Sequence, residues 1–185
     1  YVVLGKSLGS NKIVDLSQAN FKLVGENEDD YAGYAVAKAG DVGGDDLDDI
    51  IIGASGVDGT GKNSGAVYII LGRTLGPKRV VSLAEADYKF NGESRGNWAG
   101  YLISGGGDVD GDGLNDIFIG SDSDDGGREA HASYVILGRN LAAEGAYNLS
   151  QSDYKLIGVT AYDYASQVSI NGDVNGDGLD DLVIG

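Results

Sequence analysis

Short hydrophobic runs recur at a fixed interval along the whole chain, separated by stretches rich in Gly, Asp and Asn. One motif reads "YVVLG", "YIILG" and "YVILG", at 1–5, 68–72 and 134–138, with intervals of 67 and 66 residues. A second motif keeps the same two intervals and reads "FKLVG", "YKFNG" and "YKLIG", at 21–25, 88–92 and 154–158. A constant period of this kind indicates repeats that share one continuous core.

Each period contains four runs rich in Val, Ile and Tyr, and none has the spacing of an amphipathic helix. In the first full period the predicted strands are 32–40, 49–54, 65–72 and 88–92. Four strands per repeat favour an all-β fold, a β-propeller of four-stranded antiparallel blades, because radial repetition leaves only short sheet edges. A β-solenoid is the alternative, although its repeats usually run much shorter.

We treat the chain as a single repeat domain, 1–185, divided by its motifs. The predicted parts are a half blade at 1–25, a blade at 32–92, a blade at 98–158 and a half blade at 164–185. Three blades' worth of strands is below the usual four to eight. Two explanations stay open: a second copy completes the ring as a six-bladed dimer or larger assembly, or the chain is a fragment of a longer protein.

Acidic loops separate the first and second strands of each blade. They read "DVGGDDLDD", "DVDGDGLND" and "DVNGDGLDD", at 41–49, 108–116 and 173–181. Oxygen-bearing side chains at positions 1, 3, 5 and 9 suit Ca²⁺, which takes six to eight oxygen ligands, and glycine at position 6 permits a tight turn. The spacing opens like an EF-hand loop, but position 12 is not Glu and strands flank it. The pattern predicts a strand–loop–strand calcium site.

Position by position, the predicted ligands are carboxylates, one amide and the carbonyl at position 7. They are Asp108, Asp110, Asp112, Leu114 and Asp116, then Asp173, Asn175, Asp177, Leu179 and Asp181, and in the first loop Asp41, Asp45, Leu47 and Asp49. In that first loop Gly43 removes a ligand and Asp46 replaces the turn glycine, so we expect a weaker or water-completed site. Asp-Gly clusters also form turns without metal, but two full matches at the repeat period favour calcium.

The composition narrows the possible settings and partners. With 29 Asp+Glu against 13 Lys+Arg, the net charge of −16 argues against nucleic acid and anionic membranes as partners. No hydrophobic run approaches the roughly 18 residues of a membrane-spanning helix, so no membrane insertion is expected. Cysteine is absent, so disulfides cannot stabilise the fold, and calcium cross-links would take their place where calcium is abundant. An extracellular or cell-surface location is therefore expected.

Enzymatic chemistry has little support in the sequence. His131 is the one histidine and follows Arg128 and Glu129 in a polar connection, where we expect a solvent-exposed loop residue. No nucleophile elbow accompanies it, so the chain is not expected to be an enzyme. Aromatic residues repeat near the first strand of each blade, where we expect packing between blades rather than a sugar platform: Tyr31, Tyr34, Trp98, Tyr101, Tyr162 and Tyr164.

The run 31–72, with counterparts at 98–138 and 164–185, resembles the FG-GAP repeat of integrin α-subunit β-propellers and their bacterial relatives. The resemblance implies a propeller with Ca²⁺ in these loops, a surface setting and a role in adhesion or ligand recognition. It supports the ligands named above, except at Gly43 and Asp46. We therefore expect a calcium-binding structural or adhesive module that binds a protein or glycan ligand. The alternative is a carbohydrate-binding, lectin-like propeller.

Overall fold

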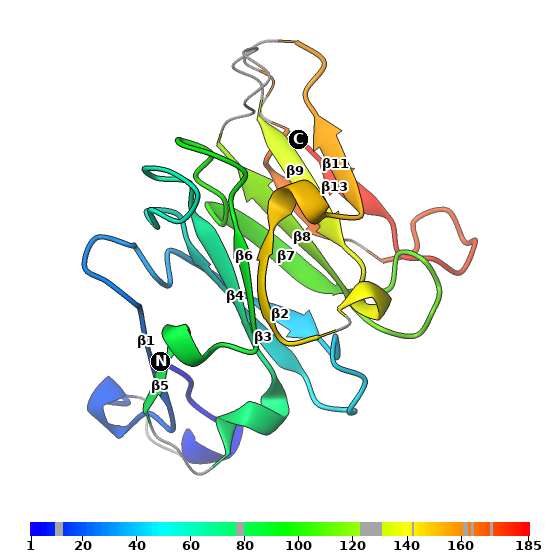
Figure 1. Ribbon diagram of the computed structural model, residues 1–185. Helices are drawn as coiled ribbons and strands as arrows, with labels where there is room; N and C mark the ends of the chain where they lie inside the picture. The colour runs from blue at the N-terminus through cyan, green and yellow to red at the C-terminus, as the bar shows by residue number, and fades with distance from the viewer. Residues whose placement is uncertain are drawn as a thin grey trace.

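The computed structural model describes residues 1–9, 13–76, 80–122, 131–141, 143–160, 163, 165–170 and 172–185. These residues form β-sheets and short 3₁₀ helices (η), with no α-helix among them. Nor do these ranges contain a helix long and apolar enough to span a membrane. The sheets follow one another in chain order from the N-terminus to the C-terminus (Figure 1). The prediction of an all-β fold is confirmed, although the described residues do not close a ring.

Two central sheets each contain four antiparallel strands from one repeat, as the repeat predicts. The first comprises β2 (Ala35–Gly40), β3 (Asp49–Ala54), β4 (Ala66–Ile70) and β6 (Tyr88–Asn91). The second comprises β7 (Leu102–Gly107), β8 (Asp116–Ser121), β9 (Ala132–Ile136) and β11 (Tyr154–Ile157). Two short strand pairs flank these sheets at the two ends of the chain.

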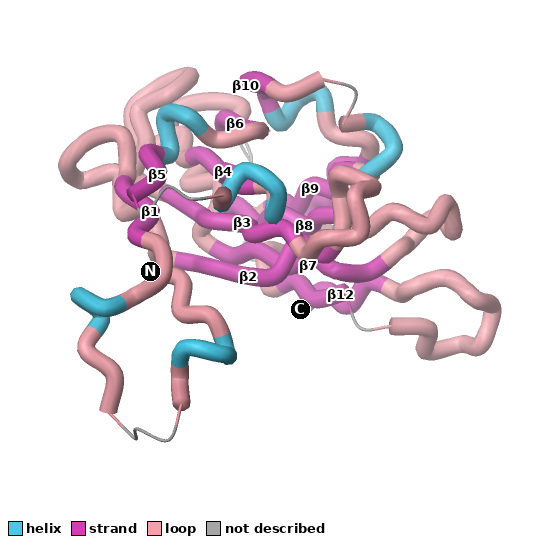
Figure 2. The backbone as a smooth tube through the Cα atoms, turned by 90° about the horizontal axis from the view of Figure 1, so that it is seen from below, coloured by secondary structure: helices cyan, strands magenta, loops and turns pink. Residues whose placement is uncertain are grey.

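Two short strands that were not predicted from the sequence lie within the polar links that join the third and fourth strands. β5 (Val80–Ser82) pairs in parallel with β1 (Lys22–Val24), and β10 (Gly145–Asn148) pairs in parallel with β6 (Figure 2). Each therefore leaves its own repeat and adds a strand to the preceding sheet. These crossing strands tie successive repeats together through backbone hydrogen bonds.

At the N-terminal end, Val2 forms an antiparallel bridge with Phe21, next to β1. At the C-terminal end, β12 (Val168–Ile170) pairs antiparallel with β13 (Leu182–Ile184). Short 3₁₀ helices follow the third strands or precede the fourth: η1 (Gly5–Ser7), η2 (Leu16–Gln18), η3 (Gly72–Leu75), η4 (Leu83–Glu85), η5 (Gly138–Asn140) and η6 (Leu149–Gln151).

The second and third strands of the central sheets are buried on both faces, which explains their continuous hydrophobic runs. Between the two central sheets, Ile51 and Ile69 belong to the same buried cluster as Ile117 and Tyr134. The opposite face of the first sheet buries Ile52, Tyr68 and Ile70 in a separate cluster. Complete burial of an isoleucine side chain contributes about 1.5–3 kcal/mol, so stacking of the repeats supplies most of the core.

Glycine in the second strand allows this close stacking. A Cβ atom at Gly53 would collide with the carbonyl oxygen of Gly100, and one at Gly120 would collide with that of Ser166. In each case the backbone of the next repeat occupies the space of a side chain, so any larger residue would separate the sheets.

A β-bulge ends the first strand of each central sheet and directs the chain into the acidic loop. The register shifts between Lys38 and Gly40, and the same shift occurs between Gly105 and Gly107. After the shift, Gly107 lies opposite Asp116, so the end of the loop is brought back beside its beginning. The loops at 41–49, 108–116 and 173–181 consequently project on one side of the molecule, the right-hand side of Figure 1.

Candidate metal centre

The middle loop, residues 108–116, wraps around the side chain of its first residue. Asp108 Oδ1 accepts hydrogen bonds from the backbone N–H groups of Gly111 (2.7 Å) and Asp112 (3.2 Å), and Oδ2 accepts one from Gly113 (2.8 Å). Gly111 and Gly113 have φ of 77° and 90°, which glycine adopts without strain. The tight turn predicted at Gly113 is confirmed, and Gly111 adds a second positive φ that was not predicted.

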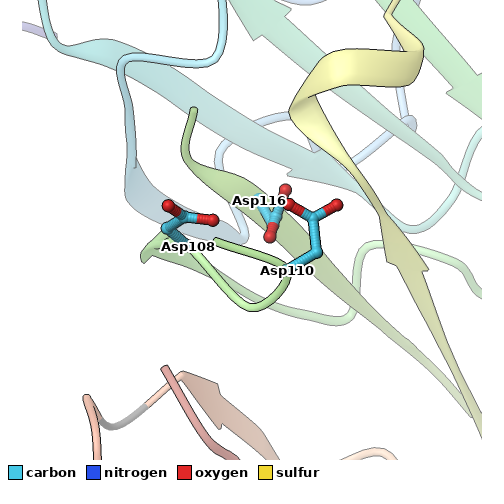
Figure 3. Close-up of side chains that lie close together, drawn as sticks. All are labelled: Asp108, Asp110 and Asp116. Carbon is cyan, nitrogen blue, oxygen red and sulfur yellow. The ribbon is translucent and has the colours of Figure 1, made fainter. Parts of the chain in front are cut away.

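Three of the four predicted carboxylates converge in this loop. Ligand oxygens of Asp108, Asp110 and Asp116 all lie within 4.8 Å of one another (Figure 3). Asp116, at the start of β8, is fully buried and accepts hydrogen bonds from the N–H groups of Val109 (2.7 Å) and Gly138 (2.8 Å). Asp112 is exposed and lies outside the group, where its Oδ1 accepts from the Leu114 N–H at 2.8 Å.

The electrostatics of the middle loop favour a cation. Burial raises the pKa of Asp116 to about 6, and the nearby charges of Asp110 and Asp108 act in the same direction. Asp110 Oδ2 is buried without a hydrogen bond; Arg139 Nη1 lies 2.8 Å away as an ion-pair partner outside hydrogen-bond alignment. Bringing a divalent cation into such a group converts mutual repulsion into attraction. The donors are all oxygens, which are the ligands of Ca²⁺.

The third loop, residues 173–181, repeats the wrapping of the middle loop. Asp173 Oδ1 accepts from the N–H groups of Gly176 (2.6 Å) and Asp177 (3.1 Å), and Oδ2 accepts from Gly178 (2.8 Å). The backbone N–H of Gly178 is the largest of the contributions that lower the pKa of Asp173. Asp181 is bonded to the Val174 N–H at 2.7 Å, as Asp116 is to Val109. The third loop thus has the same internal geometry, but most of it is exposed.

Comparisons with known proteins agree with the repeat and its loops. A family model described as the FG-GAP repeat matches residues 32–70. Human integrin alpha-X is 37% identical over 92 residues, which cover 48% of this chain and 7% of the integrin. Mouse integrin alpha-8 is 27% identical over 187 residues, which cover 97% of this chain and 15% of the integrin.

The chain belongs to the integrin-α-like FG-GAP repeat family. It spans 7% of the length of integrin alpha-X and 15% of that of integrin alpha-8. The relationship therefore concerns one region of those much longer proteins.

The FG-GAP match includes the first loop, residues 41–49, whose geometry differs from that of the other two. Asp41 still accepts N–H hydrogen bonds, from Asp45 at 3.0 Å and Asp46 at 2.7 Å. Burial opposes ionisation of Asp41, but these and neighbouring N–H donors outweigh it and lower its pKa. Asp46 takes φ of 64°, a conformation that costs a non-glycine residue about 1 kcal/mol.

A guanidinium group occupies the side of the first loop where the position-3 ligand is missing. Arg73 Nη1 lies 3.1 Å from Asp45 Oδ2 and would be 3.2 Å from a Cβ placed on Gly43. Arg139 is the equivalent of Arg73, 66 residues later, and contacts the middle loop instead at Asp110. Neither arginine is predicted by the ligand pattern, although each follows the third-strand motif as "LGR".

His131 does not occupy the exposed position that we predicted; it is 8% exposed. Its Nδ1 lies 3.3 Å from Ser166 Oγ and 3.3 Å from Asp122 Oδ1. A catalytic triad uses the two ring nitrogens separately, one toward the nucleophile and one toward the carboxylate. Because both contacts are made to the same nitrogen, this cluster has the geometry of inter-repeat packing. Arg128 and Glu129 lie outside the described residues.

The repeated aromatic residues contact one another between repeats, as predicted for Tyr34 and Tyr101. Their rings stack with centroids 5.1 Å apart, and the two side chains are 59% and 36% exposed. Tyr162 and Tyr164 lie outside the described residues.

Proposed function

We propose that this chain is a calcium-binding structural or adhesive module of an extracellular or cell-surface protein. In this proposal the FG-GAP repeats form a β-propeller, without catalytic activity of its own. Calcium holds the acidic loops and so stabilises the stacked sheets. The observation that carries the proposal is the convergence of three carboxylates in the middle loop, within a loop geometry that the third loop repeats.

The middle and third loops would hold the ions through their predicted ligands. In the middle loop Asp108, Asp110 and Asp116 are already gathered, while Asp112 and the Leu114 carbonyl would complete the oxygen set. In the third loop the corresponding donors are Asp173, Asn175, Asp177, Asp181 and the Leu179 carbonyl.

In the first loop we propose weaker binding, because Gly43 offers no ligand at position 3 and Arg73 Nη1 lies 3.2 Å from where a Cβ of that residue would be. The remaining donors there are Asp41, Asp45, Asp49 and the Leu47 carbonyl. Burial raises the pKa of Asp49, and three backbone N–H groups already donate to its carboxylate. Asp49 in these respects resembles Asp116 of the middle loop, so the missing position-3 ligand and the guanidinium account for the weaker binding.

The expected stabilisation is large compared with the stability of a typical domain. An ion present at ten times its dissociation constant adds about 1.4 kcal/mol to the free energy of unfolding. Two such sites would add about 3 kcal/mol, against a typical total of about 5–15 kcal/mol. Removal of calcium should therefore change the melting temperature by several degrees.

Thermal unfolding with calcium and with a calcium chelator tests this proposal. The wild-type chain should melt many degrees lower in the chelator. A variant carrying both Asp108→Ala and Asp173→Ala should respond little to calcium, since it lacks the first ligand of each loop. If the wild-type melting temperature were the same in both conditions, calcium would have no structural role.

Self-association through the terminal strands is a further part of the proposal. Within the chain, β8 pairs with β9 in the register Ile117↔Ile136 and Ile119↔Tyr134. In the repeat, Leu182 and Ile184 are the equivalents of Ile117 and Ile119, and Val3 and Tyr1 are the equivalents of Ile136 and Tyr134. The same register would therefore place Leu182 opposite Val3, and Ile184 opposite Tyr1. We propose that β13 of one copy pairs in this register with residues 1–4 of another, in a six-bladed dimer or a larger assembly.

One side-chain contact would fix that register. The N–H groups of Gly72 and Gly138 each donate, at 2.8 Å, to the last aspartate of the loop in the same repeat. The equivalent pair across the proposed junction is Gly5 and Asp181. Molar mass in solution with and without calcium tests this arrangement: the mass should exceed that of one chain. If the chain stayed monomeric at high concentration, pairing between copies would be refuted. The terminal strands would then be expected to pair with further repeats of a longer chain.

Carbohydrate binding is a second candidate function, favoured by one observation. Tyr34 and Tyr101 form an exposed aromatic stack, and exposed aromatic faces suit sugar rings. Glycan-array binding that is lost in Tyr34→Ala and Tyr101→Ala, and kept in Tyr154→Ala, would support this function. Tyr154 is a matched control because it is a tyrosine of similar exposure, 55%, on β11.

A further inference from the structure

Successive acidic loops are joined by a reciprocal pair of hydrogen bonds. The N–H of Asp108, position 1 of the middle loop, donates to Asp180 Oδ2 at 2.8 Å. In return, the N–H of Asp180, position 8 of the third loop, donates to the Asp108 carbonyl oxygen at 2.9 Å. We call this pair a clasp. The clasp holds both the N–H and the carbonyl oxygen of Asp108, the residue whose side chain accepts the hydrogen bonds of the middle loop.

The same clasp joins the first and middle loops. The Asp41 N–H donates to Asn115 Oδ1 at 2.8 Å, and the Asn115 N–H donates to the Asp41 carbonyl oxygen at 3.0 Å. Position 8 therefore has one role with two side chains, an aspartate in one loop and an asparagine in the other. What they share is an acceptor oxygen, so the negative charge of Asp180 is not required for the clasp.

Leucine at position 7 adds a second contact between the same loops. A Cβ on Gly111, position 4 of the middle loop, would lie 2.8 Å from Leu179 Cδ2. A Cβ on Gly44, position 4 of the first loop, would lie 3.2 Å from Leu114 Cδ2. The middle and third loops thus each contact the preceding loop at its positions 1 and 4.

We propose that Asp180 and Asn115 are positioning residues that couple the calcium sites of adjacent repeats. The inference rests on the calcium-binding function proposed above. A ligand whose backbone is already fixed loses less conformational freedom when it binds an ion, so a clasped loop has the higher affinity. Ordering of the third loop by calcium strengthens the clasp on Asp108, and the effect on affinity is reciprocal.

Site-resolved calcium titration by NMR tests this coupling, because each loop has its own glycine amides. Gly111 and Gly113 report on the middle loop, and Gly176 and Gly178 report on the third. Asp180→Ala should lower the calcium affinity seen at Gly111 and Gly113 about fivefold or more. Asp180→Asn should keep it near the wild-type value, because Asn115 forms the clasp in the preceding pair of loops.

Asp48→Ala is the matched control at the same loop position. Asp48 is position 8 of the first loop, where its side chain is 66% exposed and pairs with Lys38 at 3.0 Å. Its removal should leave the middle loop unchanged. If Asp180→Ala and Asp180→Asn weakened the middle loop equally, charge would explain the effect and the coupling would be refuted.

Two further results separate this inference from the proposed function. Wild-type glycine amides that do not respond to calcium would refute calcium binding, and the coupling with it. Calcium binding that is normal at Gly111 and Gly113 in Asp180→Ala would refute the coupling alone.

Amide hydrogen exchange in the metal-free wild type needs no variant, so it tests the clasp on Asp108 even if Asp180→Ala does not fold. Asp108 and Asp173 both occupy position 1 and both lie in the sequence Gly-Asp-Val, so their intrinsic exchange rates match. The clasped Asp108 amide should exchange at least about tenfold more slowly than that of Asp173. Equal rates would show that the clasp does not hold Asp108.

Discussion

The middle and third loops have nearly the same ligands but different surroundings. Both wrap three backbone N–H groups around their first aspartate. In the middle loop, Asp116 is fully buried and Asp108 is clasped by Asp180. In the third loop, Asp173 is exposed and Asp181 is only half-buried. The local sequence therefore determines which atoms can bind calcium, whereas contacts with neighbouring repeats determine how firmly those atoms are held.

The largest difference in stability between the two loops is expected when the last aspartate of each is replaced by alanine. Asp116→Ala would leave the buried N–H of Gly138 and the half-buried N–H of Val109 without an acceptor, at about 1–3 kcal/mol each. At concentrations where the chain is monomeric, Asp181→Ala removes an acceptor from one exposed N–H, that of Val174, and should cost about 1 kcal/mol or less. Urea unfolding in calcium measures both. Equal losses would contradict the view that the middle loop is the more firmly held.

The metal-free protein should lose stability as pH rises because of Asp116. Its pKa of about 6 in the folded chain lies above the unfolded value of about 3.9. Between these values the folded state binds more protons, so the free energy of unfolding falls as pH increases from about 4 to above 6. The total is on the order of 3 kcal/mol. The third loop has the opposite sign, because the pKa of Asp173 is lowered.

Urea unfolding at several pH values, with chelator and with excess calcium, measures this dependence. Asp116→Asn is the control: the difference between wild type and this variant isolates the titration of one carboxyl group. Calcium should remove the fall in stability, since a bound cation favours the ionised carboxylate. A metal-free wild type that is as stable at pH 7 as at pH 4.5, relative to the variant, would contradict the buried position of Asp116.

The smallest expected effect is a gain of calcium binding when the first loop is given the residues of the middle loop. Gly43→Asp, Asp46→Gly and Arg73→Ala together supply the missing ligand, the turn glycine and the space now filled by the guanidinium. Titration calorimetry should show one additional tight calcium equivalent, worth about 1.4 kcal/mol of stability at ten times its dissociation constant. Arg73→Ala alone is the control and should strengthen binding only slightly. An unchanged stoichiometry in the triple variant would disprove our explanation of the weak loop.

The strands and the loops could be predicted from the sequence because their signals are local. The runs that became β3 and β8 are short, rich in isoleucine and bounded by Asp and Gly, and the ligand spacing lies within nine residues. Tertiary pairing could not be predicted in the same way. β5 and β10 have only weak patterns of their own, and the preceding sheet decides their structure.

The candidate site shows the same division between local and distant determinants. Positions 1, 3 and 9 of the middle loop converge as their spacing predicts, whereas Asp112 at position 5 does not join them. Arg139 reaches Asp110 from a position 29 residues later in the chain. His131 was predicted to be exposed because its neighbours in sequence are polar. The structure buries it against Ser166, from the next repeat.

The central claim is that the aspartates of the middle loop are gathered around a divalent ion. A crystal structure of the chain grown in excess calcium tests it most directly. The account predicts an ion coordinated by Asp108, Asp110 and Asp116 at oxygen distances of about 2.3–2.6 Å. Density that fits only water between these carboxylates, at saturating calcium, would contradict it.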